Sequence, residues 1–343
     1  MALPGAVGAL LQPAFGILGD SGHRTRIVRA GGLAFGLSLV LMATARSYAA
    51  VAVAALILSP ASGAFVSLSQ ATLMDLVPDQ HERNMARWTL AGSVGVVAGP
   101  VLLAAAVASG AGWRWAMLVA AALTAPALLS VRSTPHVPSS QRVGVVVRRA
   151  LSAVRSRAVV RWLLLLELTD LLGDVLLGFL ALYVVDVAHA GPAEAGLTVA
   201  VWSGASLAGD ALLLAALRRI DGLRWLRWSA MVAGVAYPAF LLVHDTPGRL
   251  VLAAVLGLIH AGWYSIPKAR LFSELRGASG VAVAVSDIAG LIGAFVPLAI
   301  GAAAARFGLG AVMWVLLLAP LGILVLVPRR AQERGPERAG GPA

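Results

Sequence analysis

The sequence predicts an all-α protein that crosses a membrane many times. Of its 343 residues, 59% are hydrophobic and only 13% are charged, a balance that soluble globular domains do not show. The apolar residues gather in stretches long enough to cross a hydrocarbon core of about 30 Å. Gly and Pro are frequent inside these stretches, which is tolerated where neighbouring membrane helices satisfy the freed backbone groups. We therefore expect a polytopic bundle of transmembrane helices.

Five predicted spans come before the longest polar interval of the chain, and six come after it. The first five are expected at 3–18, 30–45, 49–74, 88–109 and 113–131. The last six are expected at 160–187, 195–217, 227–243, 250–270, 279–304 and 309–327. The predicted organisation is thus an N-terminal bundle (1–131), a cytoplasmic linker (132–158), a C-terminal bundle (159–327) and a cytoplasmic tail (328–343). The Arg-rich second half of the linker fits a juxtamembrane anchor or an amphipathic helix on anionic lipid.

The net charge of +11 follows from topology and does not indicate a nucleic-acid partner. If the hairpin at 19–29 is cytoplasmic and the sides alternate, the outside loops keep only four basic residues: Arg46, Arg114, Arg249 and Arg306. All other Arg and Lys residues then lie inside, as the positive-inside rule requires. The sequence predicts a multi-pass protein of the cell inner (cytoplasmic) membrane with its C-terminus in the cytoplasm.

A short polar hairpin follows the first span, with the sequence Gly16-Ile17-Leu18-Gly19-Asp20-Ser21-Gly22-His23-Arg24-Thr25-Arg26. It resembles the Gly-x-Leu-x-Asp-(basic)-x-Gly-(basic) loop of major facilitator transporters, matching at Gly16, Leu18, Asp20, Arg24 and Arg26. Ser21 replaces the basic residue expected after the Asp, and the second Gly is displaced to Gly22. The resemblance implies that this loop latches one conformation of a rocking cycle. The alternative is a solvated polar turn.

A faded copy of the hairpin, Leu217-Arg218-Arg219-Ile220-Asp221-Gly222-Leu223-Arg224, lies between the second and third spans of the second bundle. Duplicated bundles with substrate held between them are how this family is built. The resemblance thus implies two six-helix bundles, whereas only five spans precede the linker. It implies that the family's first helix is missing here, and we expect an earlier start to supply it.

Gly95-Val96-Val97-Ala98-Gly99-Pro100, in the fourth span, is similar to a Gly-x-x-x-Gly-Pro element of proton-exchanging exporters in the same family. Small residues at positions i and i+4 let two helix backbones approach, and the Pro permits a bend. An ordinary helix-packing face would look the same. The Arg that exporters often carry on the preceding helix is not found, since Ser59-Pro60-Ala61-Ser62-Gly63 occupies that region.

Three carboxylates in the sixth span are the strongest candidates for proton coupling. Glu167, Asp170 and Asp174 are spaced i, i+3 and i+7 and therefore share one helix face. One such group facing lipid costs roughly 2.5–3.5 kcal/mol, so all three must face the interior or water. Burial and mutual repulsion favour protonation at physiological pH. Glu167, near the cytoplasmic end, could instead pair with Arg161 or another basic loop residue and be structural. Asp210 and Asp287, single acids in their spans, are weaker candidates of the same kind.

His260, Tyr264 and Lys268 follow one another at i, i+4 and i+8 in the ninth span, beside Trp263. If Pro267 breaks this helix, the stripe suits the wall of a substrate cavity. Lys268, the single lysine of the chain, also fits the simpler role of an anchor at the inner end of the span.

Other chemistry finds little support in the sequence. The chain has no cysteine, and its one lysine does not follow a Gly-rich phosphate loop. His81-Glu82-Arg83-Asn84-Met85 lacks the second His of a zinc site. We expect no enzyme activity, cofactor or metal, and a monomer that exchanges a small-molecule substrate and protons across the lipid bilayer.

The sequence therefore predicts secondary active transport by alternating access, in the form of proton-coupled efflux. Three alternatives remain: proton-coupled uptake of a metabolite, the membrane subunit of an ATP-driven pump, and a truncated non-transporting membrane protein.

Overall fold

The computed structural model describes residues 2–133 and 141–328, and within these ranges the chain is helical and forms no strand. The linker residues 134–140 and nearly all of the predicted tail lie outside the described residues.

The N-terminal bundle contains long helices that are interrupted by short π-helical or 3-10 segments. The elements are α1 (Ala2–Leu18), η1 (Gly19–His23), α2 (Arg24–Thr44), α3 (Tyr48–Ser62), η2 (Gly63–Ser67), α4 (Leu68–Leu76), η3 (Pro78–Gln80), α5 (His81–Ala108) and α6 (Trp113–Ser133). Non-helical backbone angles at Ser21 and Gly22, where Gly22 has φ = +89°, turn the chain between α1 and α2. The predicted polar hairpin is therefore present.

The second bundle follows α7 (Val143–Ala153), a linker helix. Its elements are α8 (Arg157–Asp170), η4 (Leu171–Val175), α9 (Leu176–Asp186), α10 (Pro192–Ala216), α11 (Gly222–Leu242), α12 (Thr246–His260), α13 (Ser265–Glu274), α14 (Ser279–Gly293), α15 (Val296–Phe307), α16 (Leu309–Met313), η5 (Trp314–Leu317) and α17 (Leu318–Leu326). Helix α7 buries Val146, Ala150 and Ala153 and packs on α1, η1 and α14. The Arg-rich part of the linker thus contains an amphipathic helix that lies against the protein.

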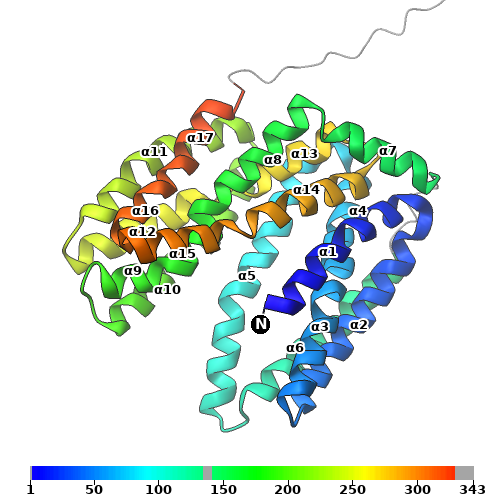
Figure 1. Ribbon diagram of the computed structural model, residues 1–343, viewed down its shortest axis with the longest axis horizontal. Coiled ribbons are helices and arrows are strands. Elements are labelled where there is room, and N and C mark those ends of the chain that lie inside the picture. Colours follow the sequence, from blue (N-terminus) through cyan, green and yellow to red (C-terminus); the bar gives the residue numbers. More distant parts are fainter. Residues whose placement is uncertain (1, 134–140, 329–343) are drawn as a thin grey trace, which may run out of the picture.

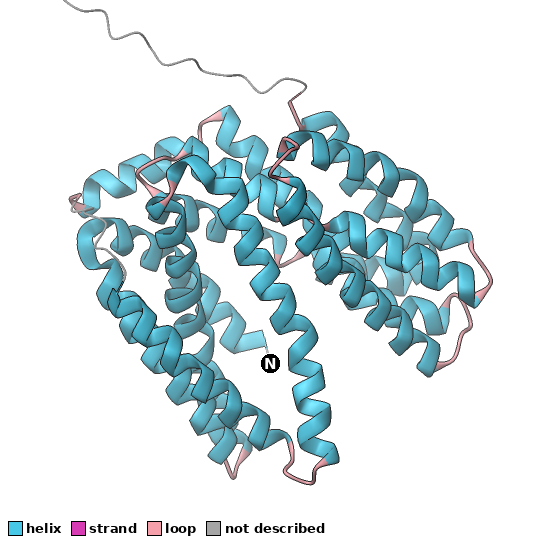
Figure 2. Ribbon diagram, turned by 180° about the vertical axis from the view of Figure 1, so that it is seen from behind, coloured by secondary structure: helices cyan, strands magenta, loops and turns pink. Residues whose placement is uncertain are grey.

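The two bundles meet at one end of the molecule and diverge toward the other (Figure 1). Helices α1 and α4 pack on α14, and α5 packs on α10 and α13, so the main contacts between the bundles run through these helices. We call the end that contains η1, the α4–α5 junction and the α13–α14 junction the closed end, and the opposite end the open end. The view from behind shows the same divergence (Figure 2).

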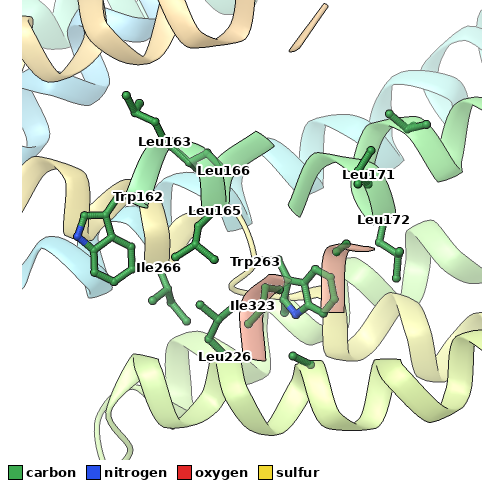
Figure 3. Close-up of a cluster of buried hydrophobic side chains, with 14 of the residues drawn as sticks. Trp162, Leu163, Leu165, Leu166, Leu171, Leu172, Leu226, Trp263, Ile266 and Ile323 are labelled. Carbon is green, nitrogen blue, oxygen red and sulfur yellow. The ribbon is translucent and has the colours of Figure 1, made fainter. Parts of the chain in front are cut away.

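The C-terminal bundle has a dense apolar core. Trp162, Leu165 and Leu166 of α8 face Ile266 of α13, and Trp263 lies near Leu226 and Ile323 (Figure 3). Trp263 is fully buried, and its indole nitrogen donates to the Ser229 hydroxyl at 2.9 Å. This core fixes α8, which carries Glu167 and Asp170, and α13, which carries Lys268.

Nine helical segments among the described residues are long and apolar enough to cross a membrane. One of them, Val7–Thr44, contains both α1 and α2. The segment Gly222–Leu242, which was predicted to contain a span, is a helix but is not among the nine. The chain is a multi-pass membrane protein, while the count of five and six spans stays a prediction.

A buried ion pair ties α10 to α12 within the second bundle, and we expect its loss to lower stability strongly. Arg249, 2% exposed, donates to Glu194 at 2.5 Å and to the His244 carbonyl at 3.3 Å. Arg249→Met should destabilise the protein by about 3–5 kcal/mol, because it leaves a largely buried carboxylate without its partner. Thermal unfolding in detergent measures this. The exposed control Arg219→Met should leave the Tm unchanged, and equal Tm values for both variants would contradict the prediction.

Candidate functional site

Asp20 connects the two bundles at the closed end. Its carboxylate accepts hydrogen bonds from the backbone N–H groups of Gly280 and Val281 at 3.0 and 2.9 Å. These groups belong to the first turn of α14, whose N–H groups have no partner within the helix and whose dipole favours a negative charge. Asp20 is 4% exposed. The prediction of a solvated turn is therefore wrong for this residue.

Arg24 extends this contact to a second acid. It donates to Asp20 at 2.5 Å, to Asp75 at the end of α4 at 2.5 Å and to the Ser279 hydroxyl at 2.8 Å. Ser279 in turn donates to Asp75 at 2.5 Å. We call Asp20, Arg24, Asp75 and Ser279 the closed-end cluster. Arg26, predicted to belong to the latch, is exposed and forms no ion pair among the described residues.

Glycines let the bundle backbones touch beside this cluster. A Cβ atom built on Gly16 of α1 would collide with the carbonyl oxygen of Gly280 and with Ala284. One built on Gly280 would collide with the Gly16 carbonyl and the Asp20 carboxylate. Gly16 thus acts as a point of close contact between helices, at the start of the motif that the sequence singles out.

Gly280→Ala should push the two bundles apart at the closed end. A cysteine at Val97, one turn beyond Ser93 on the face of α5 that meets α10, would report the change. The natural chain has no cysteine, so this would be the sole thiol. We expect labelling of Val97→Cys by a membrane-impermeant maleimide, added at the open end, to slow several-fold in the Gly280→Ala background. Gly234→Ala is the control, since nothing lies within 4 Å of its added methyl group; equal rates in both backgrounds would contradict the prediction.

A second polar cluster lies at the closed end between α5 and α13. Arg270 of α13 pairs with Glu82 of α5 at 2.7 Å and with Asp221 at 3.1 Å. The ring nitrogens of His81 lie 2.8 Å from the Ser273 hydroxyl and 3.2 Å from the Met74 carbonyl. Asp221 belongs to the faded hairpin copy, so both hairpins place an acid beside an arginine between two helices.

The three carboxylates of the sixth predicted span lie together. Glu167, Asp170 and Asp174 line one cavity of about 230 Å³, whose other wall is formed by Gly290, Gly293, Ala294, Val296 and Pro297 of the α14–α15 region. Asp170 directly precedes η4 and Asp174 lies within it; η4 is a π-helical segment of the kind often found at functional sites. We call this space the carboxylate cavity. The Glu167 carboxylate packs against Gly293, where an added Cβ would displace it, and it forms no ion pair with Arg161 among the described residues.

Lys268 lies behind these acids and is only 7% exposed. It donates to the Ser286 hydroxyl of α14 and lies 5.9 Å from the Phe272 ring centre. Glu167, Asp170 and Asp287 all interact with it electrostatically. Asp287 follows Ser286, and its Oδ2 is buried without a hydrogen-bond partner. Lys268 is thus a buried cation among carboxylates, and its interpretation as an inner-end anchor is wrong.

The predicted stripe of His260, Tyr264 and Lys268 does not form, because the helix breaks earlier than expected. Helix α12 ends at His260, and α13 begins at Ser265 after a turn in which Gly262 has φ = +92°. Pro267 lies in the first turn of α13, where its missing N–H costs no hydrogen bond. His260 contacts the Trp202 and Trp263 rings and lies against Gly173 of η4, whereas Tyr264 is 37% exposed.

Asp210 lies where α10 meets α5 of the other bundle, whereas the two glycines of the α5 motif are exposed. Asp210 of α10 is 5% exposed and accepts a hydrogen bond from Ser93 of α5 at 2.5 Å. Gly95 and Gly99 have no atom within 4 Å of an added Cβ, and Pro100 is exposed inside an unbroken α5. No helix therefore packs closely on this motif in the described conformation.

Two bundles, a polar closed end and membrane-embedded acids define a multi-pass membrane transporter. The family model described as the Major Facilitator Superfamily matches residues 1–296. The chain belongs to this family. A search of curated proteins finds no match.

Solved structures with the same fold are distant in sequence. One structure of the fucose:proton symporter FucP of E. coli is 14% identical, with a TM-score of 0.77 over 94% of this chain and 88% of that chain. FucP in the outward conformation is also 14% identical, with a TM-score of 0.78 over 94% and 87%. The human organic anion transporter MFSD10 is 18% identical, with a TM-score of 0.70 over 95% and 82%.

Proposed function

We propose that the protein moves a small molecule across the cytoplasmic membrane by alternating access, driven by protons that bind in the carboxylate cavity. The observation that carries this proposal is the meeting of Glu167, Asp170 and Asp174 in one cavity beside the buried Lys268. Carboxylates inside a membrane protein that are not all paired with cations are suited to bind and release protons.

The closed-end cluster supports the alternating-access part of the proposal. Under the predicted topology the closed end faces the cytoplasm, so the described conformation is open to the outside. Asp20 on the α1–α2 hairpin of the first bundle and the first turn of α14 in the second hold this end together. Opening it must break these hydrogen bonds, which makes the cluster the latch that the sequence motif implies.

The direction of transport has two candidates. Export is what the Gly95 to Pro100 motif favours, yet that motif has no close helix neighbour in this conformation. Uptake together with protons is favoured by Lys268. When the acids around this buried cation bind protons, its charge becomes available to a substrate that enters with them.

Proteoliposomes that contain the purified protein test the proposal. With a pH-sensitive dye inside and a metabolite library outside, at least one compound should move protons through the protein, and an uncoupler should abolish its accumulation. Proton-independent transport of every transported compound would contradict the coupling. Transport that requires ATP and a co-purified ATPase would favour the pump subunit instead.

A further inference from the structure

We propose that the transported molecule is a small organic anion, held in the carboxylate cavity by the charge of Lys268 once protons have neutralised the surrounding carboxylates. This inference rests on the proposed function and names the substrate class of the same site. Three observations carry it: the burial of Lys268, the acids around it and the size of the cavity that those acids line.

Lys268 has few contacts that could stabilise its charge if the acids were neutral. Its hydrogen-bond partner is the Ser286 hydroxyl, and the Phe272 ring lies nearby. A buried ammonium without a counter-charge is costly, and breaking a buried pair commonly costs about 3–5 kcal/mol. Protonation of Glu167, Asp170 or Asp287 therefore creates a site that favours a new anion. Anion binding and proton binding then strengthen each other, since linkage between two sites is reciprocal.

The titratable groups around Lys268 come from several helices. Glu167 and Asp170 lie on α8, Asp174 lies on η4, and Asp287 lies on α14. Helix α12 brings His260, which contacts Trp202 and Trp263. Helix α5 also packs on α13, but its His81 and Glu82 face Ser273 and Arg270, further along α13. Acids thus outnumber the buried cation, so the site accepts protons before it can hold an anion.

Glu167 and Asp170 line the carboxylate cavity, whereas Lys268 does not. An anion that enters the cavity meets the acids first and is repelled until they are protonated. The cavity volume of about 230 Å³ is below the roughly 300–1,000 Å³ typical of drug-sized ligands. A compact carboxylate or phosphonate fits this space.

The test measures protons that are bound together with a ligand. Lactate, benzoate and methylphosphonate serve as anionic probes, and tetramethylammonium serves as the cationic probe. Each is added to the purified full-length protein in weakly buffered detergent solution. At least one anion should bind with proton uptake, and its apparent Kd should weaken up to tenfold for each unit of rising pH. Lys268→Met should abolish both signals, while Arg306→Met, an exposed change at the open end, should keep them.

If Lys268→Met fails to fold, Lys268→Met combined with Asp287→Asn removes one charge of each sign and serves in its place. Proton release on binding of tetramethylammonium would overturn the anion assignment and leave proton coupling intact. The absence of binding for all three anions, or anion binding that survives loss of Lys268, would also overturn it. Failure of the proposed function gives a different result: substrate movement in proteoliposomes that ignores the pH gradient.

Discussion

Asp20→Asn is expected to slow transport by about tenfold to a hundredfold while leaving membrane insertion intact. The variant weakens two hydrogen bonds to the first turn of α14 and removes the charge that faces Arg24. Hydrogen bonds to charged groups contribute about 1.5–3 kcal/mol each, and 1.4 kcal/mol corresponds to a factor of ten in an equilibrium. The population of the conformation in which the closed end is shut should therefore fall by at least this factor. Because every transport cycle passes through this conformation, turnover should fall as well.

Turnover in proteoliposomes and labelling of Val97→Cys measure the two parts of this result. Turnover should fall, and labelling added at the open end should slow in parallel. Asp79→Asn is a suitable control, because Asp79 is exposed and pairs with Arg276 only at 3.7 Å. A normal turnover for Asp20→Asn would remove the latch from the mechanism.

Asp170→Asn combined with Asp174→Asn is expected to abolish accumulation driven by a proton gradient. With one proton per substrate, a gradient of one pH unit can sustain about tenfold accumulation, since each unit is worth about 1.4 kcal/mol. The double variant keeps the shape of both side chains but cannot bind a proton at either. Accumulation should fall to the equilibrium level, whereas exchange of labelled for unlabelled substrate should continue.

The contrast between accumulation and exchange separates a coupling defect from a folding defect, which would lower both. Asp186→Asn provides the matched control, because Asp186 ends α9 and does not line the carboxylate cavity. Unchanged sensitivity of the double variant to an uncoupler would show that coupling lies elsewhere, with Asp210 as the next residue to test.

The sequence predicted the elements whose signal is local. Apolar stretches located the helices, and the charge and glycine pattern located the hairpin at Asp20. The spacing of Glu167, Asp170 and Asp174 correctly placed them on one face, since they line one cavity despite the π-helical segment that begins after Asp170. Each of these depends on neighbours within a few turns of the same helix.

The residues that sequence reasoning missed depend on contacts between distant segments. Asp75 joins the closed-end cluster through Arg24, which is 51 positions away. The sequence did carry one signal for Asp75: it is an acid just before Val77-Pro78, at the cytoplasmic end of a predicted span. Lys268 was placed near the inner end of a span predicted to cover 250–270, with a break expected only at Pro267. The break at Ala261–Tyr264 follows from a positive φ at Gly262, which no hydropathy pattern reveals.

The backbone contact between Gly16 and Gly280 bears on the speed of the transport cycle. Where side chains from two helices interdigitate, separating the helices requires many rotamers to change together. At the Gly16–Gly280 contact the two helices touch through bare backbone, beside a few polar groups that water can replace as they part. The contact between α1 and α14 at this point thus combines a smooth backbone surface with the hydrogen bonds of Asp20. We therefore expect α1 and α14 to part here with little change of side-chain rotamers, whereas Met74 of α4 and Met85 of α5, which join the core of the second bundle, must repack when the closed end opens.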